Sequence, residues 1–299
     1  MGEIKASIII PAYNEELSIA GVCQELLECL DMSQTEIIVV DDGSTDRTGE
    51  IAEQFSQIRT IHHRRNRGYG AAIRTGTKEA QGEIVAWYDS DGQHRPEDLL
   101  KVIKRMTEEN LDYCICISGG NSYEEKSRKF GKWILRVFLR MMTKESIHDF
   151  NSGLRAFKRK ILLCYLPLLP AGFGASTVTT LLMKEQAFIG GEVEITVKPR
   201  IGKSTVKQIR DGLRTMGLIL NIIILFRPLV IFGAIGSFVL VASLAYGIYC
   251  ALTVGLGIPV LSSIGIFLGL ELICLGLISH QISSMRRENY YYLYENQKG

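Results

Sequence analysis

The chain has 299 residues, a length that fits one large domain or two modest ones. Its 34 Lys and Arg residues and 32 Asp and Glu residues give a formal net charge of +2, which argues against nucleic acid as a partner, because a basic stripe is expected there. Apolar residues make up 46% of the chain but are spread unevenly. The chain resembles a soluble domain up to about Gly212 and is mostly apolar after Met216.

The N-terminus leads directly into a strand-like segment and has no long apolar core of the kind found in signal peptides. We therefore expect the first domain to stay on the side of the membrane where it is made. Strands and helices then alternate, which predicts an α/β fold with a mostly parallel sheet and helices on both faces. The predicted strands cover residues 7–10, 36–40, 58–61, 83–88 and 112–117. Helices are predicted at 15–30 and 70–80. A further helix is predicted to be capped by Thr45 or Asp46 and to end near residue 55, and another to start at Pro96.

Three polar segments follow predicted strands, at residues 11–15, 41–46 and 89–94. In a parallel sheet the ligand lies beyond the carboxyl ends of the strands, so these segments are expected to form one site. Asp89 and Asp91 stand one residue apart and can hold a divalent ion that keeps phosphate or water in its shell. A metal held in this way would stabilise a diphosphate leaving group.

Other nucleotide-binding motifs fit poorly. Residues 68–70 lack the third glycine of a dinucleotide fingerprint, and residues 202–204 have no upstream glycine at the spacing of a P-loop. The seven cysteines are an odd number without zinc-ligand spacing, so neither a disulfide framework nor a zinc site is expected.

Residues 122–142 form a basic amphipathic stretch, which is either a solvated face of a packed helix or a helix at the membrane surface near an anionic ligand. Residues 205–227 predict an amphipathic interface helix. Two apolar stretches, about 229–250 and 260–282, are each long enough to cross a bilayer. The basic residues that flank them, Arg227 before and Arg286 and Arg287 after, place both ends in the cytoplasm.

The predicted organisation is therefore a cytoplasmic catalytic domain (1–204), the interface helix (205–227), a transmembrane hairpin (228–283) and a cytoplasmic tail (284–299). Glu271 lies inside the second span and is either functional, protonated or paired across helices. The spacing of Gly265 and Gly269 permits close helix approach and indicates a possible homo-oligomer.

The polar segments also resemble a known family. Residues 7–16 (SIIIPAYNEE), 39–46 (VVDDGSTD) and 89–94 (DSDGQH) look like those of family 2 glycosyltransferases, which have the GT-A fold of nucleotide-diphospho-sugar transferases. Residues 149–155 (DFNSGLR) and 200–204 (RIGKS) narrow the resemblance to the polyprenyl-phosphate glycosyltransferases. The resemblance covers roughly residues 5 to 215. The sequence departs from the usual family pattern at Gly92 and Leu154, which leaves the identity of the sugar open.

The resemblance implies a role for each matching residue. The donor nucleotide sugar, a UDP- or GDP-hexose, would be bound by Pro11, Tyr13, Glu15, Asp41, Asp42 and Asp89. Mg²⁺ or Mn²⁺ would be held by Asp89, Asp91 and Gln93. The predicted catalytic residues are Asp91, Arg155 and Arg200, and those near the acceptor phosphate are Arg128, Arg136, Ser152 and Lys203.

The implied reaction is an inverting, metal-dependent transfer of a hexose to undecaprenyl or dolichyl phosphate at the cytoplasmic face of the plasma membrane. Such an acceptor needs no general base, because a phosphate monoester with a second pKa near 6 is already mostly ionised at neutral pH. His94 and His148 are accordingly interpreted as structural groups. Two alternatives remain: a glycosyltransferase that acts on another lipid or glycan, and a non-catalytic membrane scaffold.

Overall fold

The computed structural model describes residues 4–118, 152–172, 174–199, 224, 227–253, 255 and 257–296. The chain forms two compact units, residues 1–208 and 209–299.

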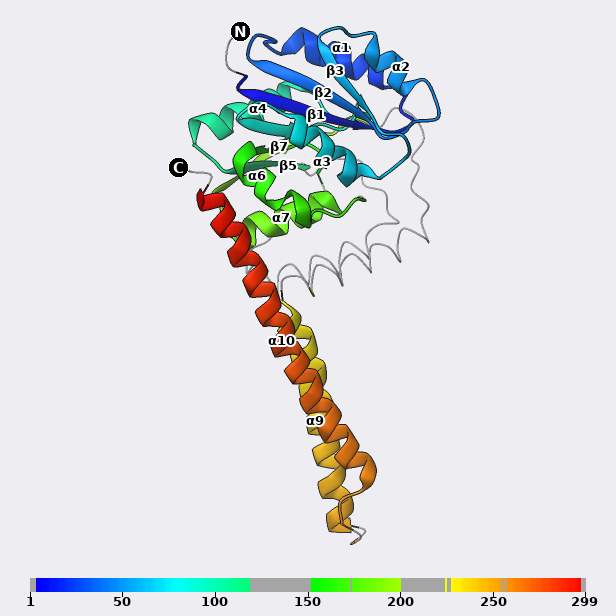
Figure 1. Cartoon of the computed structure of the whole chain (residues 1–299), viewed down its shortest axis with the longest axis vertical. Coiled ribbons are helices and arrows are strands. Elements are labelled where there is room, and N and C mark those ends of the chain that lie inside the picture. Colours follow the sequence, from blue (N-terminus) through cyan, green and yellow to red (C-terminus); the bar gives the residue numbers. More distant parts are fainter. Residues whose placement is uncertain are drawn as a thin grey trace. The chain divides into compact units, whose positions relative to one another are not determined.

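The first unit is built on a seven-stranded sheet with the strand order β3-β2-β1-β4-β6-β5-β7 (Figure 1). The four pairs β1–β2, β2–β3, β1–β4 and β5–β7 are parallel, and only the two pairs that involve β6 are antiparallel. The predicted mostly parallel sheet is thereby confirmed. The strands are β1 (Ala6–Ala12), β2 (Thr35–Asp41), β3 (Ile58–His62), β4 (Ile84–Trp87), β5 (Tyr113–Ser118), β6 (Arg155–Lys158) and β7 (Gly190–Ile195).

Helices cover both faces of this sheet, as predicted (Figure 1). One group packs together around α1 and α4 and contacts β2 to β7, and the other packs around α3 against β1 and β2. The first group consists of α1 (Ile19–Cys29), α2 (Thr48–Glu53) and α4 (Pro96–Glu108). The second consists of α3 (Tyr69–Glu79), α6 (Arg159–Tyr165), which continues into the short η2 (Leu166–Leu168), and α7 (Ala175–Glu185).

The central strand β1 is buried on both faces, which explains its unbroken apolar run. Ile8 and Ile10 join the core beneath α1 and α4. Ile9 faces α3, where a Cβ on Gly76 would stand 2.3 Å from the Cγ2 atom of Ile9. Because Gly76 has no side chain, α3 packs closely on β1 and presents its first residue, Tyr69, at the carboxyl edge of the sheet.

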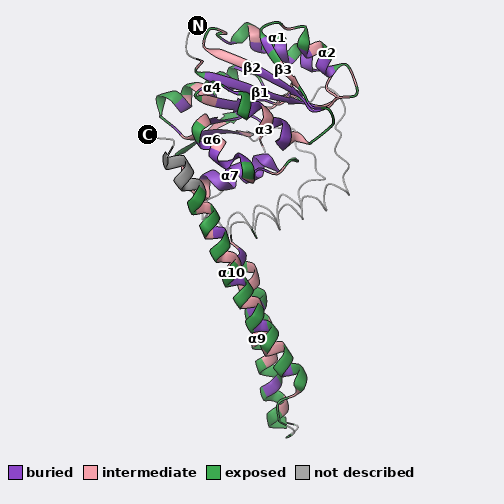
Figure 2. Cartoon of the chain, in the orientation of Figure 1, coloured by how far each residue is buried: buried purple, intermediate pink, exposed green. Residues whose placement is uncertain are grey.

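The second unit is a helical hairpin of α9 (Pro228–Thr253) and α10 (Val260–Asn296). At a rise of 1.5 Å per residue, α9 is about 39 Å long, more than the roughly 30 Å of a bilayer's hydrocarbon core. By length and composition, Pro228–Thr253 and Val260–Asn289 are candidate membrane spans. Only 6% and 17% of their most apolar windows are buried within the chain, and Figure 2 shows exposed positions along both helices.

Small residues hold the two hairpin helices together. A Cβ on Gly236 would stand 2.8 Å from the carbonyl oxygen of Gly269, and one on Gly265 would overlap the hydroxyl of Ser243. The hydroxyl of Ser262 donates to the carbonyl of Ser243 at 2.6 Å. The glycines whose spacing indicated close helix approach are therefore used inside the hairpin. The predicted homo-oligomer stays a prediction, and Glu271 lies on the exposed surface of α10.

Candidate functional site

The candidate site lies at the carboxyl edge of the three adjacent strands β2, β1 and β4. The polar segments predicted from the sequence follow these strands, and the parallel register pairs Ala12 with Asp41 at the end of β1 and β2. The carbonyl of Pro11 accepts a hydrogen bond from the Ser90 hydroxyl at 2.9 Å, which ties the end of β1 to the segment after β4. The fold thus brings all three segments to one edge.

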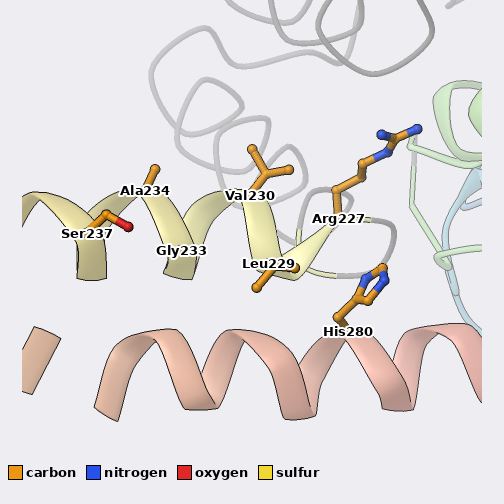
Figure 3. A pocket seen from close by; sticks show the side chains of 7 residues that line it. All are labelled: Arg227, Leu229, Val230, Gly233, Ala234, Ser237 and His280. Atoms are coloured by element: carbon orange, nitrogen blue, oxygen red, sulfur yellow. The ribbon is translucent and has the colours of Figure 1, made fainter. Parts of the chain in front are cut away.

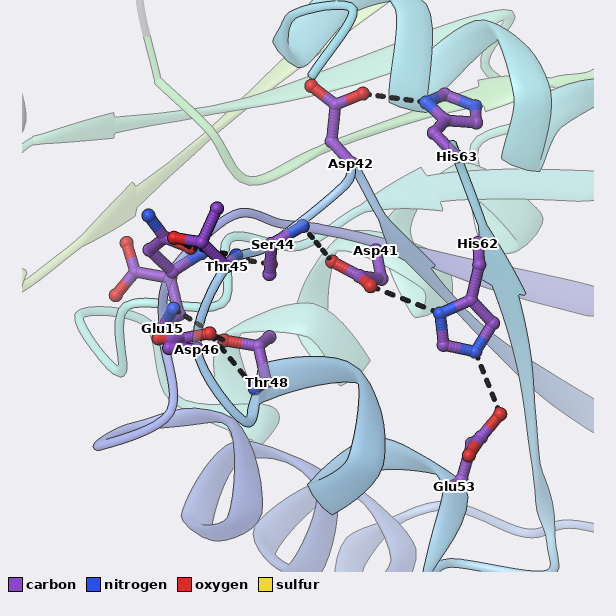
Figure 4. A network of polar contacts seen from close by, with 11 residues as sticks. Glu15, Asp41, Asp42, Ser44, Thr45, Asp46, Thr48, Glu53, His62 and His63 are labelled. Carbon is purple, nitrogen blue, oxygen red and sulfur yellow. Dashed lines mark hydrogen bonds and ion pairs between the residues drawn. The ribbon is translucent and has the colours of Figure 1, made fainter. Parts of the chain in front are cut away.

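The segments after β1 and β2 are locked together by reciprocal hydrogen bonds (Figure 4). The backbone N–H of Asn14 donates to the Ser44 hydroxyl at 3.0 Å, and the side-chain oxygen of Asn14 accepts from the N–H of Thr45 at 2.8 Å. Asn14 has a φ of 56°, a left-handed conformation that asparagine tolerates better than most residues. The N–H of Glu15 donates to the Thr48 hydroxyl at 2.8 Å. These bonds fix the backbone around the predicted donor-binding residues Tyr13 and Glu15.

Asp41 and Asp42 organise neighbouring loops. Asp41 accepts from the N–H of Ser44 at 3.0 Å and lies 3.0 Å from the Nδ1 atom of His62 (Figure 4). Asp42 is 2.6 Å from the Nδ1 atom of His63 and accepts from the N–H groups of Arg67 and Gly68 at 3.0 and 2.7 Å. Both carboxylates are buried, so a large part of their hydrogen-bonding capacity shapes the loop that leads into α3. Their predicted contact with the donor stays a prediction.

His62 bridges two carboxylates on the outer side of this loop (Figure 4). Its Nε2 atom lies 2.8 Å from Glu53, opposite the contact with Asp41. Partial burial lowers the pKa of His62, but the hydrogen bonds and charges of Asp41 and Glu53 outweigh it, so the pKa is raised overall. The side chain is 42% exposed, which weakens the energetic effect of this ion pair through solvent screening.

Asp89 lies at the centre of a cluster that the sequence did not predict. Its Oδ1 atom accepts a hydrogen bond from the Tyr69 hydroxyl at 3.1 Å, and its Oδ2 atom is 3.8 Å from the Nε2 atom of His94. Burial raises the pKa of Asp89, but His94, Tyr69 and the charge of Arg155 together lower it below its ordinary value. Asp89 is therefore ionised at neutral pH.

Gly153 brings the segment before β6 against this carboxylate. A Cβ at Gly153 would stand 1.7 Å from the Oδ2 atom of Asp89, so only a glycine allows this approach. The neighbouring Ser152, predicted to lie near the acceptor phosphate, is partly exposed beside it. The structure thus places Gly153, part of the motif at 149–155, beside Asp89.

Asp91 and Gln93 complete the predicted metal-binding set. The carboxylate of Asp91 accepts from the N–H of Gln93 at 3.1 Å. The Gln93 amide donates through Nε2 to the Lys198 carbonyl at 3.2 Å, which orients the amide and leaves its Oε1 atom as the candidate ligand. Two carboxylates and an amide oxygen are hard donors that suit Mg²⁺ or Mn²⁺. Within the described residues, no group of three or more His, Cys, Asp and Glu residues gathers as a metal site, so donor chemistry alone supports the assignment.

Arg155, predicted to be catalytic, is completely buried. Its guanidinium group donates to the Ser152 carbonyl at 2.9 Å, to the Ser176 carbonyl at 2.6 Å and to the hydroxyl of Thr180 at 3.0 Å, and it lies over the ring of Trp87. It joins β6, the segment before it and the start of α7. These contacts fix the backbone beside Asp89, and the predicted catalytic role of Arg155 stays a prediction.

The remaining predicted residues lie outside the part of the chain that the structure describes. They are Arg128, Arg136, His148, Arg200 and Lys203, together with most of the predicted interface helix. Conversely, His63 and Tyr69 were missed by the sequence reasoning. The signal that could have found them is weak, because each contacts an aspartate 20 or 21 positions away along the chain.

Two protein families match the chain. Residues 7–166, more than half of the chain, match the family described as glycosyl transferase family 2. Residues 227–285 match the family described as the GtrB C-terminal hairpin, which coincides with α9 and most of α10.

Several curated proteins are similar to half of the chain or slightly more. An uncharacterised protein of Methanocaldococcus jannaschii is 36% identical over 157 residues, which are 50% of this chain and 63% of that protein. The UDP-N-acetylglucosamine–dolichyl-phosphate N-acetylglucosaminyltransferase of Methanococcus voltae is 32% identical, over 52% of this chain and 70% of its own. The undecaprenyl-phosphate 4-deoxy-4-formamido-L-arabinose transferase of Pseudomonas aeruginosa is 28% identical, over 57% of this chain and 55% of its own. The chain thus spans little more than half to about two thirds of these relatives.

Among solved structures, the glucosyl-3-phosphoglycerate synthase of Mycobacterium tuberculosis in complex with phosphoglyceric acid has a TM-score of 0.60 at 22% identity. The match covers 73% of this chain and 80% of that one. The same enzyme with Mn²⁺, UDP-glucose and phosphoglyceric acid matches with a TM-score of 0.59 at 21% identity, over 73% of this chain and 79% of that one. At this identity the likeness shows the fold, which is the GT-A-like arrangement predicted from the sequence.

Proposed function

The chain belongs to glycosyl transferase family 2, and on that premise we propose that it transfers a hexose from a UDP- or GDP-sugar to the phosphate of a polyprenyl phosphate, with inversion, at the cytoplasmic face of the membrane. The observation that carries this proposal is the close approach of the segment before β6 to Asp89, the first of the two aspartates after β4. Gly153 contacts Asp89 so closely that the two segments form one surface.

The family membership and the hairpin support the finer parts of the proposal. The two named relatives act on dolichyl phosphate and undecaprenyl phosphate according to their names, although their sugars differ. The hairpin match and the two candidate spans indicate a chain that works at a membrane, where such lipids are found. A hexose as the transferred group remains our choice among these sugars.

The described residues suggest how the site prepares the reaction. Asp41 and Asp42 hold the loops that follow β2 and β3. Asn14 and Ser44 join the loops that follow β1 and β2. The donor would therefore meet a rigid surface. Such alignment lowers the entropy cost of bringing donor and acceptor together. No general base is required, because a phosphate monoester with a second pKa of about 6 is already ionised.

A divalent ion fits the oxygen donors of Asp89, Asp91 and Gln93 and, when bound, would supply positive charge to the diphosphate leaving group. The lowered pKa of Asp89 keeps that carboxylate ionised and ready to bind a cation. Arg155 fixes the carbonyl of Ser152, and with it the backbone of Gly153 against Asp89.

Sugar transfer in detergent tests the proposal. The purified full chain would be given undecaprenyl phosphate, Mg²⁺ or Mn²⁺ and a panel of radiolabelled UDP- and GDP-sugars, with Asp91→Ala and a chelator as controls. We expect a labelled lipid with one donor, which disappears in both controls. Metal-dependent donor binding without a labelled lipid would instead favour another lipid or glycan acceptor, and the absence of donor binding would favour the scaffold.

A further inference from the structure

The segment after β7 is tied to the predicted metal-binding segment by two hydrogen bonds. The backbone N–H of Lys198 donates to the carbonyl of Gln93 at 2.9 Å, and the Gln93 amide donates through Nε2 to the carbonyl of Lys198 at 3.2 Å. The two residues stand 105 positions apart in the chain. Because the carbonyl of each residue accepts from the other residue, the two backbones are joined here by a closed ring of contacts.

The side chain of Gln93 has one end for each of two tasks. A carbonyl oxygen only accepts hydrogen bonds, so the end of the amide that faces Lys198 is the donor Nε2. The acceptor Oε1 is thereby left for the cation that Asp89 and Asp91 are predicted to hold with it. Coordination of a cation by Oε1 polarises the amide, which makes its N–H a stronger donor to Lys198.

The Lys198 carbonyl directs the chain that follows it. It belongs to the planar peptide unit that joins Lys198 to Pro199, and the ring of Pro199 fixes the φ of that residue at about −65°. Only the ψ of Pro199 is then free between the held carbonyl and the next residue, Arg200, which the family resemblance assigns to catalysis. Holding the Lys198 carbonyl therefore limits the directions in which the chain can continue towards a predicted catalytic residue.

The other contacts of this segment are weaker anchors for the carbonyl. The Nζ atom of Lys198 lies 3.6 Å from Glu25 on α1, but the two side chains are 38% and 52% exposed, so solvent screens the pair. Val197 is partly buried against the core beneath α1 and α4 and fixes the chain one residue earlier. The amide of Gln93 is the contact that reaches the carbonyl itself.

We propose that Gln93 is a positioning residue that couples cation binding to the backbone at Lys198, an inference that rests on the proposed function and its metal site. Oε1 of Gln93 binds the cation and Nε2 holds the Lys198 carbonyl, so the start of the chain towards Arg200 is held more firmly in the cation-loaded protein. Such coupling is reciprocal, because a bond to Lys198 that the cation strengthens also tightens binding of the cation by the same factor.

Hydrogen exchange at the Lys198 amide, followed by mass spectrometry of the full-length protein in detergent, tests this inference without donor or lipid. Opening of the ring of contacts exposes this amide to water. We expect saturating Mn²⁺ to slow its exchange by about three- to tenfold, the size of one hydrogen bond. Gln93→Glu keeps an oxygen ligand but has no N–H donor. It should still bind Mn²⁺, followed by electron paramagnetic resonance, but its exchange at Lys198 should no longer respond to the ion.

Two variants serve as controls. Glu25→Gln removes the ion pair of Lys198 and leaves both bonds to Gln93 in place. Ser237→Ala changes a side chain of the second unit, where it lines a cavity of about 490 Å³ in the hairpin (Figure 3). Both variants should keep the full response of the Lys198 amide to Mn²⁺. Loss of the response in Glu25→Gln would assign it to the ion pair and overturn the proposal.

Three further results would overturn the proposal. A wild-type protein that binds Mn²⁺ without slower exchange at Lys198 refutes it, whether or not circular dichroism shows the Gln93→Glu variant to be folded. A response that persists in folded Gln93→Glu shows that Mn²⁺ acts through the aspartates alone. A wild-type protein that binds no Mn²⁺ has no cation to couple.

The same samples separate this inference from the proposed function. A Gln93-dependent response in a protein that transfers no sugar supports the coupling and refutes the proposed reaction. Mn²⁺-dependent sugar transfer by a protein whose exchange at Lys198 ignores the ion supports the reaction and refutes the coupling.

Discussion

Replacing Gly153 by alanine tests whether the contact between the two active-site segments matters for the reaction. A Cβ at this position would stand 1.7 Å from the Oδ2 atom of Asp89, whereas real Cβ contacts essentially never fall below 3.0 Å. The carboxylate or the backbone must therefore move by about 1.3 Å. Asp89 cannot rotate freely, because it accepts a hydrogen bond from Tyr69 and lies 3.8 Å from His94.

A displacement of about 1 Å in a catalytic group can lower the rate by about 100-fold. We therefore expect Gly153→Ala to lower kcat/KM for sugar transfer by about two orders of magnitude, or about 2.7 kcal/mol of transition-state stabilisation. The assay is transfer of a radiolabelled sugar to undecaprenyl phosphate in detergent. Thermal unfolding of the same samples shows whether the variant is folded. A glycine-to-alanine change without strain stabilises the folded protein, because it reduces the entropy of the unfolded chain, so a lowered melting temperature would report the strain at this position.

Gly21→Ala is the matched control, because a Cβ at that position on α1 has no atom within 4 Å. It should keep full activity and a slightly raised melting temperature. Full activity in a folded Gly153→Ala protein would refute the reasoning, since it would show that the carboxylate of Asp89 need not occupy the position that this structure gives it.

Three further substitutions address the groups around the site. Tyr69→Phe removes the hydroxyl that orients Asp89 and should weaken Mn²⁺ binding, followed by electron paramagnetic resonance, by about three- to tenfold. Arg155→Met leaves the Ser152 carbonyl without the guanidinium donor and should lower the free energy of unfolding of the full chain by about 1–3 kcal/mol in a denaturant titration. His62→Gln should destabilise the protein more at pH 6 than at pH 9, measured as melting temperature. Its raised pKa means that the ion pair with Asp41 stabilises fully below about pH 6.5 and is lost as the pH rises through the folded-state pKa.

Each of these has a result that contradicts it. Unchanged Mn²⁺ affinity in Tyr69→Phe would show that the hydroxyl does not orient the ligand. Thr179→Val serves as the control for Arg155→Met, because it removes one neutral partner of the guanidinium and leaves the two carbonyl contacts in place. Equal losses in the two variants would show that those carbonyl contacts contribute little. A pH-independent loss in His62→Gln would show that packing alone accounts for it.

Much of the fold was predictable because its elements carry long, regular patterns. The predicted strands at 7–10 and 36–40 lie inside β1 and β2, and the helix predicted at 70–80 coincides with α3 within one residue at each end. β6 was missed, because its four residues begin and end with a basic side chain, unlike the all-apolar β4 of the same length, and its antiparallel direction has no local signal. The helix predicted from Glu15 begins at Ile19, since the intervening residues form the turn that meets the segment after β2.

The site was predictable as a location but less so as an arrangement of contacts. The polar segments indicated the carboxyl edge of the sheet, because the order of strands and helices determines where strand ends meet. A motif does not reveal burial, however, so the contacts of the buried Arg155 with backbone carbonyls and threonine hydroxyls could not be predicted from it. Tyr69 and His63 escaped notice because the pairs they form with aspartates depend on how α3 and β3 pack.

The way in which the rim carboxylates are neutralised suggests a division of labour among them. Burying a carboxylate is costly unless hydrogen bonds or opposite charges compensate it. Asp42 is compensated within the protein by His63 and two backbone N–H groups. Asp41 is compensated by His62 and the backbone N–H of Ser44. Asp89 has a tyrosine hydroxyl, a more distant imidazole and the charge of Arg155, and a glycine beside it in place of a side chain. Because the side chain of Asp89 is 29% exposed and that of Asp42 only 4%, we expect Mn²⁺ to stabilise the ligand-free protein through Asp89, whereas substitutions at Asp42 should affect folding before they affect metal binding.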